Sequence, residues 1–131
     1  KTGALDPATA CAWTETRDLP GVASPIAYDG LLYVMKSGGG ILSAFDGETG
    51  ERVYAPERLI GVQSAYASPI AAGGNIYLLG RDGSCEVVAA GREFKSLAVN
   101  ELDDRFDASP AVVGDALLLR GHHHLYCIAP D

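Results

Sequence analysis

Three consecutive histidines, His122, His123 and His124, are the residues of this sequence whose type most directly suggests chemistry. Neutral imidazole is the commonest metal ligand in proteins, so adjacent histidines invite a search for a metal site. Neighbouring side chains on a β-turn point in different directions, however, and no cysteine or carboxylate is spaced beside these three to complete a ligand shell. We therefore expect a solvated hairpin tip and no metal site. If a metal did bind, the three histidines would be the candidate ligands.

An acidic segment, Asn100-Glu101-Leu102-Asp103-Asp104 followed by Asp107, is the second candidate site. Calcium takes about six to eight oxygen ligands, which closely spaced carboxylates often provide. The spacing does not match an EF-hand loop, which has a glycine at its sharp turn and a glutamate at its end. We expect a solvated connection between two structural units here.

Glycine and serine motifs add no catalytic candidate. Gly38-Gly39-Gly40 lacks the Gly-Lys-Ser/Thr ending and the following helix of a phosphate-binding loop. No serine lies in a Gly-x-Ser-x-Gly setting. The sequence therefore predicts no catalytic residue, no cofactor-binding residue and no bound cofactor.

The three cysteines, Cys11, Cys85 and Cys127, are too widely spaced for a metal motif. Free cysteine behaves as a small hydrophobic residue, which predicts buried structural thiols. Pairing of Cys11 with Cys127 is the alternative.

Composition limits the class of protein. The chain has 131 residues, enough for one ordinary domain, and 47% of them are hydrophobic. Its formal net charge of −7 argues against a nucleic-acid partner, because phosphate binding needs a basic surface. No apolar run reaches the length of about 18 residues that a transmembrane helix needs.

An internal repeat organises the chain. A serine-proline motif occurs three times, at 23–26, 67–70 and 108–111, with a period of about 40 residues. Each copy is followed at the same distance by a turn and an apolar triplet; the triplets are Leu32-Tyr33-Val34, Ile76-Tyr77-Leu78 and Leu117-Leu118-Leu119. A second turn and a third apolar segment follow each triplet.

The repeating unit is therefore four short strands joined by turns, which is typical of a β-propeller blade. The stretch Ala44–Tyr54, AFDGETGERVY, is the hairpin between the third strand and the outer, fourth strand. We predict an all-β chain with no helix longer than two turns. Residues 95–104 are the best helical candidate, although an outer strand and a loop are expected there.

The same hairpin carries a family resemblance. Ala44, Asp46, Gly50 and Tyr54 match the pattern Ala-x-Asp-x-x-x-Gly-x-x-x-Trp, with tyrosine in place of tryptophan. The pattern resembles the pyrroloquinoline-quinone-type (PQQ-like) propeller repeat. In that family the aromatic residue docks between neighbouring blades, and the Asp and Gly shape the turn. The aromatic residues at this point of the repeat are Trp13, Tyr54 and Phe94.

The resemblance implies several functions, because a fold does not fix an activity. A quinone-dependent oxidoreductase would need a calcium-bound cofactor and a catalytic Asp, and no such residue maps onto this chain. Other relatives act as scaffolds, such as the propeller lipoprotein of outer-membrane barrel assembly. We expect a non-catalytic module for protein interaction or scaffolding, with part of a quinone-dependent oxidoreductase or a secreted carbohydrate-binding propeller as alternatives. A periplasmic or extracellular location is implied.

The predicted blades do not close a ring. Residues 1–131 are expected to form a single partial propeller, in which residues 1–17 supply a lone strand that completes a blade. Blades are predicted over 22–60 and 65–100, and 107–131 is a blade without its fourth strand. A propeller has about four to eight blades, so about three blades per chain leave apolar faces and strand edges open.

Two explanations remain open. The chain is the C-terminal segment of a longer propeller, or copies of it assemble. In a dimer, Cys11–Arg17 of each copy would complete the partner's 107–131 blade and close a six-bladed ring, since exchange of an element is a low-cost route to a symmetric dimer. Cys11 and Cys127 would then lie on neighbouring strands.

Overall fold

A computed structural model describes residues 3–36 and 38–130. Outside the described residues lie 1–2, 37 and 131, which belong to the predicted lone-strand segment 1–17, to the glycine-rich turn and to the end of the predicted blade 107–131.

The described residues form an all-β protein with one helix of four residues, α1 (Pro7–Ala10). The predicted all-β class without long helices is therefore confirmed, and residues 95–104 contain a strand rather than a helix. The strands are β1 (Ile26–Tyr28), β2 (Leu31–Lys36), β3 (Ile41–Asp46), β4 (Arg52–Arg58), β5 (Ile70–Ala72), β6 (Asn75–Leu79), β7 (Ser84–Ala89), β8 (Ser96–Glu101), β9 (Ala111–Val113), β10 (Ala116–Arg120) and β11 (Leu125–Ile128). No helix in the described ranges is long and apolar enough to span a membrane.

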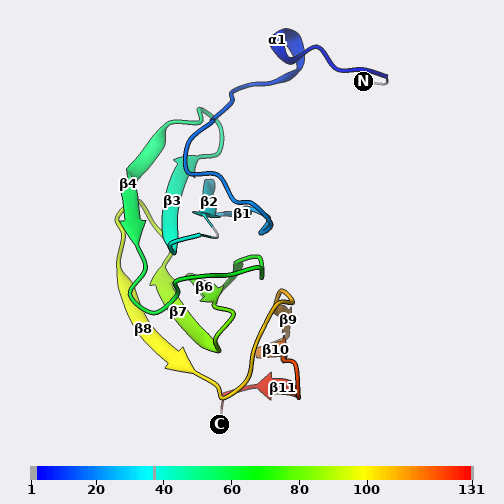
Figure 1. Ribbon diagram of the computed structural model, residues 1–131. Coiled ribbons are helices and arrows are strands. Elements are labelled where there is room, and N and C mark those ends of the chain that lie inside the picture. The colour runs from blue at the N-terminus through cyan, green and yellow to red at the C-terminus, as the bar shows by residue number, and fades with distance from the viewer. Residues whose placement is uncertain (1–2, 37, 131) are drawn as a thin grey trace.

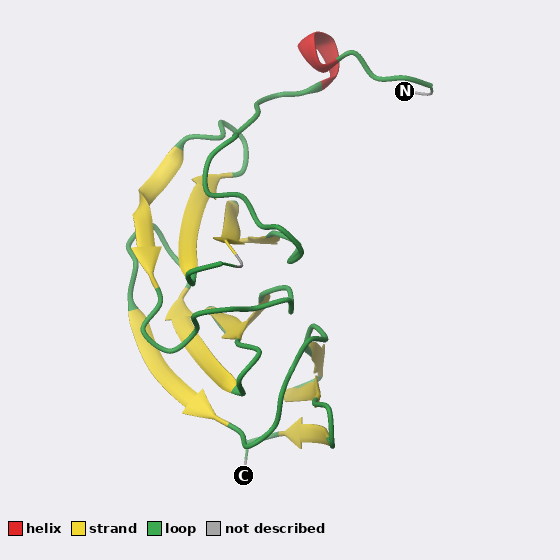
Figure 2. Ribbon diagram, viewed as in Figure 1, coloured by secondary structure: helices red, strands yellow, loops and turns green. Residues whose placement is uncertain are grey.

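The strands form three antiparallel sheets, each a meander in which strands adjacent in sequence pair. The first blade has the order β1-β2-β3-β4, the second blade β5-β6-β7-β8, and the third blade only β9-β10-β11. Figure 2 shows the sheets following one another along an open arc, with β4 and β8 on its outer side. The arc does not close into a ring, which confirms the prediction of an incomplete β-propeller.

Tight turns with left-handed residues join the first two strands of the complete blades. Asp29 and Gly30 have φ of 48° and 74°, and Gly73 and Gly74 have φ of 56° and 79°. Positive φ at both central positions is what a type I′ hairpin turn requires, and Gly and Asp adopt it with little strain. The two-residue loops fix the register of the strands, so the sequence repeat becomes a repeat of paired positions.

The core lies between the blades. Strand β2 is buried on both faces because it packs between neighbouring elements, so its sequence LLYVMK does not alternate strictly. The larger cluster joins the first and second blades and contains Leu31, Tyr33, Met35, Leu42, Ala44, Leu59, Val62, Ala65, Ile76, Leu78 and Val88. A smaller cluster joins the second and third blades and contains Ala67, Leu79, Phe106 and Leu119.

The N-terminal segment differs from the strand expected over residues 11–17. Helix α1 precedes this segment and is capped by Asp6, whose Oδ1 accepts a hydrogen bond from the Ala8 N–H at 3.0 Å. Residues 11–17 form no strand with any described part of the chain, because a strand needs a neighbouring edge with which to pair. In Figure 1 helix α1 lies beyond the first blade, at the opposite end of the arc from β11.

Candidate functional site

The acidic segment and the histidine turn meet at Asp104, which lies in the connection between the second and third blades. Its Oδ2 accepts hydrogen bonds from the backbone N–H groups of His123 and His124, both at 3.1 Å, and from the Tyr126 hydroxyl at 3.2 Å. Its Oδ1 accepts one from the Arg105 N–H at 2.7 Å. The residue is only 7% exposed, so the expectation of a solvated acidic loop is wrong at this position.

The environment of Asp104 favours its charged form. Burial by itself would raise the pKa of this carboxyl, but the hydrogen bonds from the backbone of Arg105, His123 and His124 outweigh it. The pKa therefore lies well below its ordinary value. A carboxylate held by donors from both sides of the junction fixes the β10–β11 turn against the preceding connection.

A second polar link crosses the same junction at Asp107. Its Oδ1 accepts a hydrogen bond from Arg81 Nε at 2.7 Å, and its Oδ2 lies 3.0 Å from His122 Nε2. The Arg81 guanidinium also lies 4.0 Å from the ring centroid of Tyr66, a cation–π distance. Hydrogen bonds from Arg81 and then from His122 lower the pKa of Asp107. Arg81 thus joins the connections that enter the second and third blades.

These contacts give the histidines a structural setting that sequence spacing did not reveal. His122 faces Asp107, and His124 Nδ1 lies 3.6 Å from Asp104 Oδ2, although each carboxylate is far from its histidine in sequence. The expectation that no carboxylate accompanies the histidines is therefore corrected. Among the described residues no three His, Cys, Asp or Glu side chains converge as a metal site would require.

The polar groups at the junction between the second and third blades do not fit a calcium-bound quinone. Such a cofactor would need cationic groups for its carboxylates and free carboxylate oxygens for its metal ion. Arg81 is held by Asp107 and stacked on Tyr66, and the Asp104 oxygens are occupied by backbone and hydroxyl donors. We derive no chemical step through that cofactor.

Trp13 docks on the first blade from the N-terminal segment. Its ring is stacked on Phe45, with centroids 6.4 Å apart, and its Nε1–H donates to the Gly47 carbonyl at 3.2 Å. Gly50 lies under the indole with φ of 74°, and a Cβ at this glycine would lie 2.5 Å from the Trp13 ring. The turn after β3 is therefore shaped to receive an aromatic ring from the segment that precedes the first blade.

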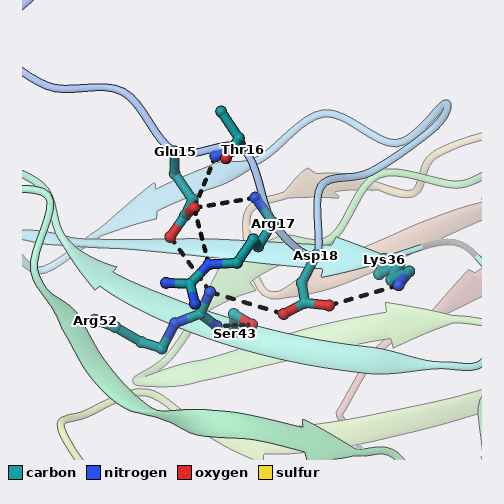
Figure 3. A network of polar contacts seen from close by, with 7 residues as sticks. All are labelled: Glu15, Thr16, Arg17, Asp18, Lys36, Ser43 and Arg52. Atoms are coloured by element: carbon teal, nitrogen blue, oxygen red, sulfur yellow. Dashed lines mark hydrogen bonds and ion pairs between the residues drawn. The ribbon is translucent and has the colours of Figure 1, made fainter.

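Ion pairs hold the rest of this segment against the first blade, as Figure 3 shows. Arg52 Nη2 lies 3.4 Å from Glu15 Oε2 and 3.8 Å from Asp18 Oδ2, while its Nη1 donates to Ser43 Oγ at 2.8 Å. Lys36 Nζ lies 3.5 Å from the other oxygen of Asp18. The acidic side chains of the segment are thus neutralised by the blade on which it lies.

Tyr54 joins the first and second blades by an aromatic contact similar to that of Trp13 with the first blade. Its ring meets Phe94 edge to face, with centroids 6.1 Å apart. The Tyr54 hydroxyl is buried and has no hydrogen-bond partner among the described residues, and this burial raises the pKa of Tyr54. An indole that reaches a carbonyl at this place, as Trp13 does, satisfies its N–H, whereas the tyrosine hydroxyl stays unpaired.

The strand registers separate Phe94 from Tyr54. Tyr54 lies within β4 opposite Ala44, which is fully buried, whereas Phe94 lies in the turn before β8. Asp46 shapes the first blade's turn: its Oδ1 accepts hydrogen bonds from two backbone N–H groups of that turn, and its Oδ2 lies 2.9 Å from Arg92 Nη2 of the second blade. The two aromatic contacts are similar: the Tyr54 ring of the first blade packs on Phe94 of the second blade, and the Trp13 ring packs over Gly50 of the first blade.

The third blade has an open strand edge. Strand β11 pairs with β10 on one side and with no described strand on the other, where β3 and β7 have β4 and β8. Leu125 is 73% exposed and Ile128 44% exposed. A groove of about 290 Å³ runs between the second and third blades, and its lining includes Cys85, Leu102, Leu117 and Ile128.

The cysteines differ from the expected buried thiols. Cys11 and Cys127 are exposed, because both lie on segments whose blade is incomplete, and the three cysteines are free. Cys85 is partly buried on β7, and burial raises the pKa of its thiol to about 11. Its thiolate is therefore suppressed at neutral pH, so it is a poor nucleophile.

Comparisons with known proteins support the fold and leave the activity open. No protein-family model and no curated protein matches the chain. A europium-containing methanol dehydrogenase of known structure is similar, with 18% sequence identity over 84% of this chain and 22% of that chain and a TM-score of 0.63. BamB from Moraxella catarrhalis is similar with 13% identity over 76% of this chain and 40% of that chain, at a TM-score of 0.54.

These similarities, together with the repeated blades, define the class of protein as a β-propeller. The chain forms a partial ring of such blades, and both similar structures, at under 25% identity, support this fold. The chain spans 22% of the dehydrogenase and 40% of BamB, so the activities of those whole proteins are not transferred to it.

Proposed function

We propose that this chain is a non-catalytic β-propeller module that acts by binding protein, as a scaffold or interaction domain. The observation that carries the proposal is the third blade, whose β11 pairs on one side with no other described strand and whose Leu125 and Ile128 are exposed. Unpaired edges bind other strands by backbone hydrogen bonds, and exposed apolar side chains beside them add affinity and specificity. The partner is a second copy of this chain or the remainder of a longer propeller.

The polar groups at the junction between the second and third blades support a structural role. Asp104 and Asp107 each hold donors from across the junction between the second and third blades. Their oxygens are used to fix the blades, and Arg81 is used in the same way. A scaffold needs this rigidity, because a surface held in one geometry loses less entropy on binding.

A role as part of a quinone-dependent oxidoreductase is the second candidate, favoured by the similarity to a methanol dehydrogenase. Titration of the chain with pyrroloquinoline quinone and calcium separates the two. We expect no saturable change in quinone absorbance and no oxidation of an alcohol or aldose. Saturable binding accompanied by oxidation would overturn the non-catalytic proposal.

We further propose a periplasmic or extracellular location, which the PQQ-like fold favours. Free exposed cysteines such as Cys11 and Cys127 would then meet an oxidising environment. Fractionation of cells that carry the parent gene, with immunodetection of the blades, tests this location. Recovery in the cytosolic fraction would contradict it.

A further inference from the structure

We propose that the outer edge of strand β8 binds an extended, basic segment of a partner protein, which adds to the second blade as a further strand. Strand β8 belongs to a blade in which all four strands are present. No described strand pairs with its outer side, and Figure 1 shows β8 on the outer side of the arc. This surface is separate from the β11 edge, so it goes beyond the proposed function.

The backbone of β8 presents hydrogen-bonding groups on this outer side. The Leu102 N–H donates to the Gly83 carbonyl at 3.1 Å, so the backbone groups of Leu102 face β7. In an antiparallel pair, residues that face the partner strand alternate with residues that face away from it. Counted back along the register with β7, Val99 and Glu101 are the residues that face away. Their N–H and C=O groups therefore form the edge to which another strand can bond.

The other outer strand, β4, is protected against such pairing, and β8 is not. Strand β4 contains Pro56, which has no backbone N–H to donate. It also carries the charged side chains of Arg52, Glu57 and Arg58. Prolines and charges are the usual means by which an edge strand avoids pairing with another chain. Strand β8, with the sequence SLAVNE, has no proline, and Glu101 is its one charged residue.

Two exposed apolar side chains lie beside this edge, on the side of the first blade. Val99 is 41% exposed, and Ile60, in the connection that follows β4, is 75% exposed. The connection and the strand are in close contact, because an added Cβ at Gly61 would collide with Val99 Cγ1. Both blades that border this surface have four strands, so a missing strand does not cause the exposure. An apolar side chain of an added strand would be buried there.

A buried carboxylate fixes this surface in one geometry. Glu86 of β7 is fully buried, and its Oε2 accepts a hydrogen bond from the Gly61 N–H at 2.9 Å. Its Oε1 accepts one from the Ser96 hydroxyl at 2.7 Å. The connection and strand β8 are therefore held by the same side chain. A surface held in this way loses less conformational entropy when a partner binds.

The charge beside the edge selects a basic occupant. A hollow of about 460 Å³ lies at the end of β8, and its lining includes Asp82, Glu101 and Asp103. None of these three carboxylates forms an ion pair with a described residue. The Ser84 hydroxyl donates to Asp82 at 2.6 Å, and this hydrogen bond lowers the pKa of that carboxyl, which is therefore charged at neutral pH.

Charge also argues against a second copy of this chain at the same edge. Each copy carries a formal net charge of −7 and would bring its own carboxylates to the contact. Like charges set opposite each other on neighbouring strands are destabilising, whereas opposite charges attract. The occupant is therefore a segment of another protein that sets a lysine or arginine opposite Glu101.

This arrangement predicts the side-chain pattern of the partner segment. Side chains two positions apart lie on the same face of a strand. A basic residue opposite Glu101 is then two positions from an apolar residue opposite Val99. The probe is the synthetic peptide Lys-Thr-Val-Thr-Lys-Thr-Val-Thr-Lys, whose lysines and valines share one face and whose threonines favour an extended chain.

Titration of the full chain with the fluorescently labelled probe is the first test. We expect saturable binding that weakens as salt is added. One control peptide has glutamate in place of each lysine, and the other has its backbone amides N-methylated. Each control should bind at least about tenfold more weakly, because it lacks the charge or the backbone donors that the edge requires. No saturation at millimolar probe, or equal binding of either control, would overturn the proposal.

Residue-resolved amide hydrogen exchange locates the bound probe. The outward-facing amides of Val99 and Glu101 should exchange rapidly in the unbound chain and slow by at least about tenfold with the probe. The inward-facing amide of Asn100 should be protected in both states. Protection of β11 amides in place of Val99 and Glu101 would overturn this proposal and leave the proposed function at the β11 edge intact.

Glu101→Lys and Glu93→Lys form a matched pair for the charge requirement. Both glutamates are exposed and both substitutions change the net charge equally, but Glu93 precedes β8 and is not in the lining of the acidic hollow. Glu101→Lys should weaken binding of the probe by at least about tenfold, and Glu93→Lys by less than about twofold. Equal effects would mean that net charge alone attracts the peptide, which would also overturn the proposal.

Discussion

The first and third blades are built from the same repeat, yet they bury their side chains very differently. Leu42 on β3 is fully buried, whereas Leu125, which holds the same position on β11, is 73% exposed. Phe45 and Ile128 show the same contrast, at 1% and 44% exposed. The difference teaches that a propeller strand is buried by its neighbours and not by its own sheet, as expected when each repeat contacts only the next.

The third blade is nevertheless anchored on its inner side. Phe106, in the connection that leads to it, is fully buried and meets Tyr126 with ring centroids 5.8 Å apart. Asp104 and Asp107 add hydrogen bonds across the same junction. The exposed residues therefore belong to a fixed surface with one open side, which is a suitable binding surface.

A matched pair of leucine substitutions tests this contrast with the largest expected effect. Leu42→Ala removes a fully buried side chain and should lower the free energy of unfolding by about 2–5 kcal/mol. Leu125→Ala should change it by no more than about 0.5 kcal/mol, because that side chain is exposed in the single chain. Urea unfolding at a concentration where the chain is monomeric measures both, and equal losses would contradict the difference in burial.

Two tyrosines of the first blade, the buried Tyr33 and the partly buried Tyr54, test its junction with the second blade. The Tyr33 hydroxyl accepts a hydrogen bond from the Gly91 N–H at 2.8 Å, so Tyr33→Phe should cost about 1–3 kcal/mol by leaving that donor unpaired. The Tyr54 hydroxyl has no partner in the described ranges, so Tyr54→Phe should leave stability unchanged or raise it. Thermal unfolding of both variants checks this order, and a larger loss for Tyr54→Phe would refute it.

Acid unfolding tests the link at Asp104. Because its pKa is depressed in the folded chain, the contribution of Asp104 to stability is present above its ordinary pKa of 3.8 and is lost as the pH falls towards the folded value. Asp104→Asn should lower stability at neutral pH and flatten the decline below about pH 4. Asp103→Asn, at an exposed neighbour, should preserve the parental profile. Urea midpoints from about pH 7 to pH 2 provide the measurement, and parallel profiles for the two variants would argue against the link.

Gly30 and Gly50, which share a φ of 74°, provide the test with the smallest expected effect, a local change around Trp13. An added Cβ at Gly50 would collide with Trp13, whereas one at Gly30 would meet nothing within 4 Å. Both alanine substitutions carry similar backbone strain, of about 1–2 kcal/mol. Only Gly50→Ala should shift the fluorescence of Trp13, the single tryptophan of the chain, towards longer wavelength. Identical spectra for the two variants would mean that Trp13 does not dock there.

The sequence predicted the blades well because their cues are local. Turn residues such as Asp29-Gly30 and the apolar triplets recur at a fixed period, so strands β1 to β11 could be placed before any contact was known. The register of the outer strands was harder to predict from the sequence. Phe94 follows Tyr54 at the repeat distance, yet it lies in a turn and not in a strand. One residue more or less in a turn changes which position an aromatic residue occupies.

The polar links could not be predicted, because they join residues that the fold brings together from afar. Nothing in the local sequence indicates that Asp104 accepts hydrogen bonds from His123 and His124. The exposure of Cys11 and Cys127 was also missed, since burial in this fold depends on a neighbouring strand that the described chain does not supply.

Amide hydrogen exchange on β11 tests the central claim most directly, namely that the third blade is a complete blade except for one strand. The comparison is between β11 and its counterpart β7, at concentrations where the chain is monomeric and where it is assembled. We expect the outward-facing amides of β11 to exchange rapidly in the monomer and to become as protected as those of β7 in the assembly. Rapid exchange of β11 in both states, with β7 protected throughout, would contradict the claim that this edge is where the partner binds.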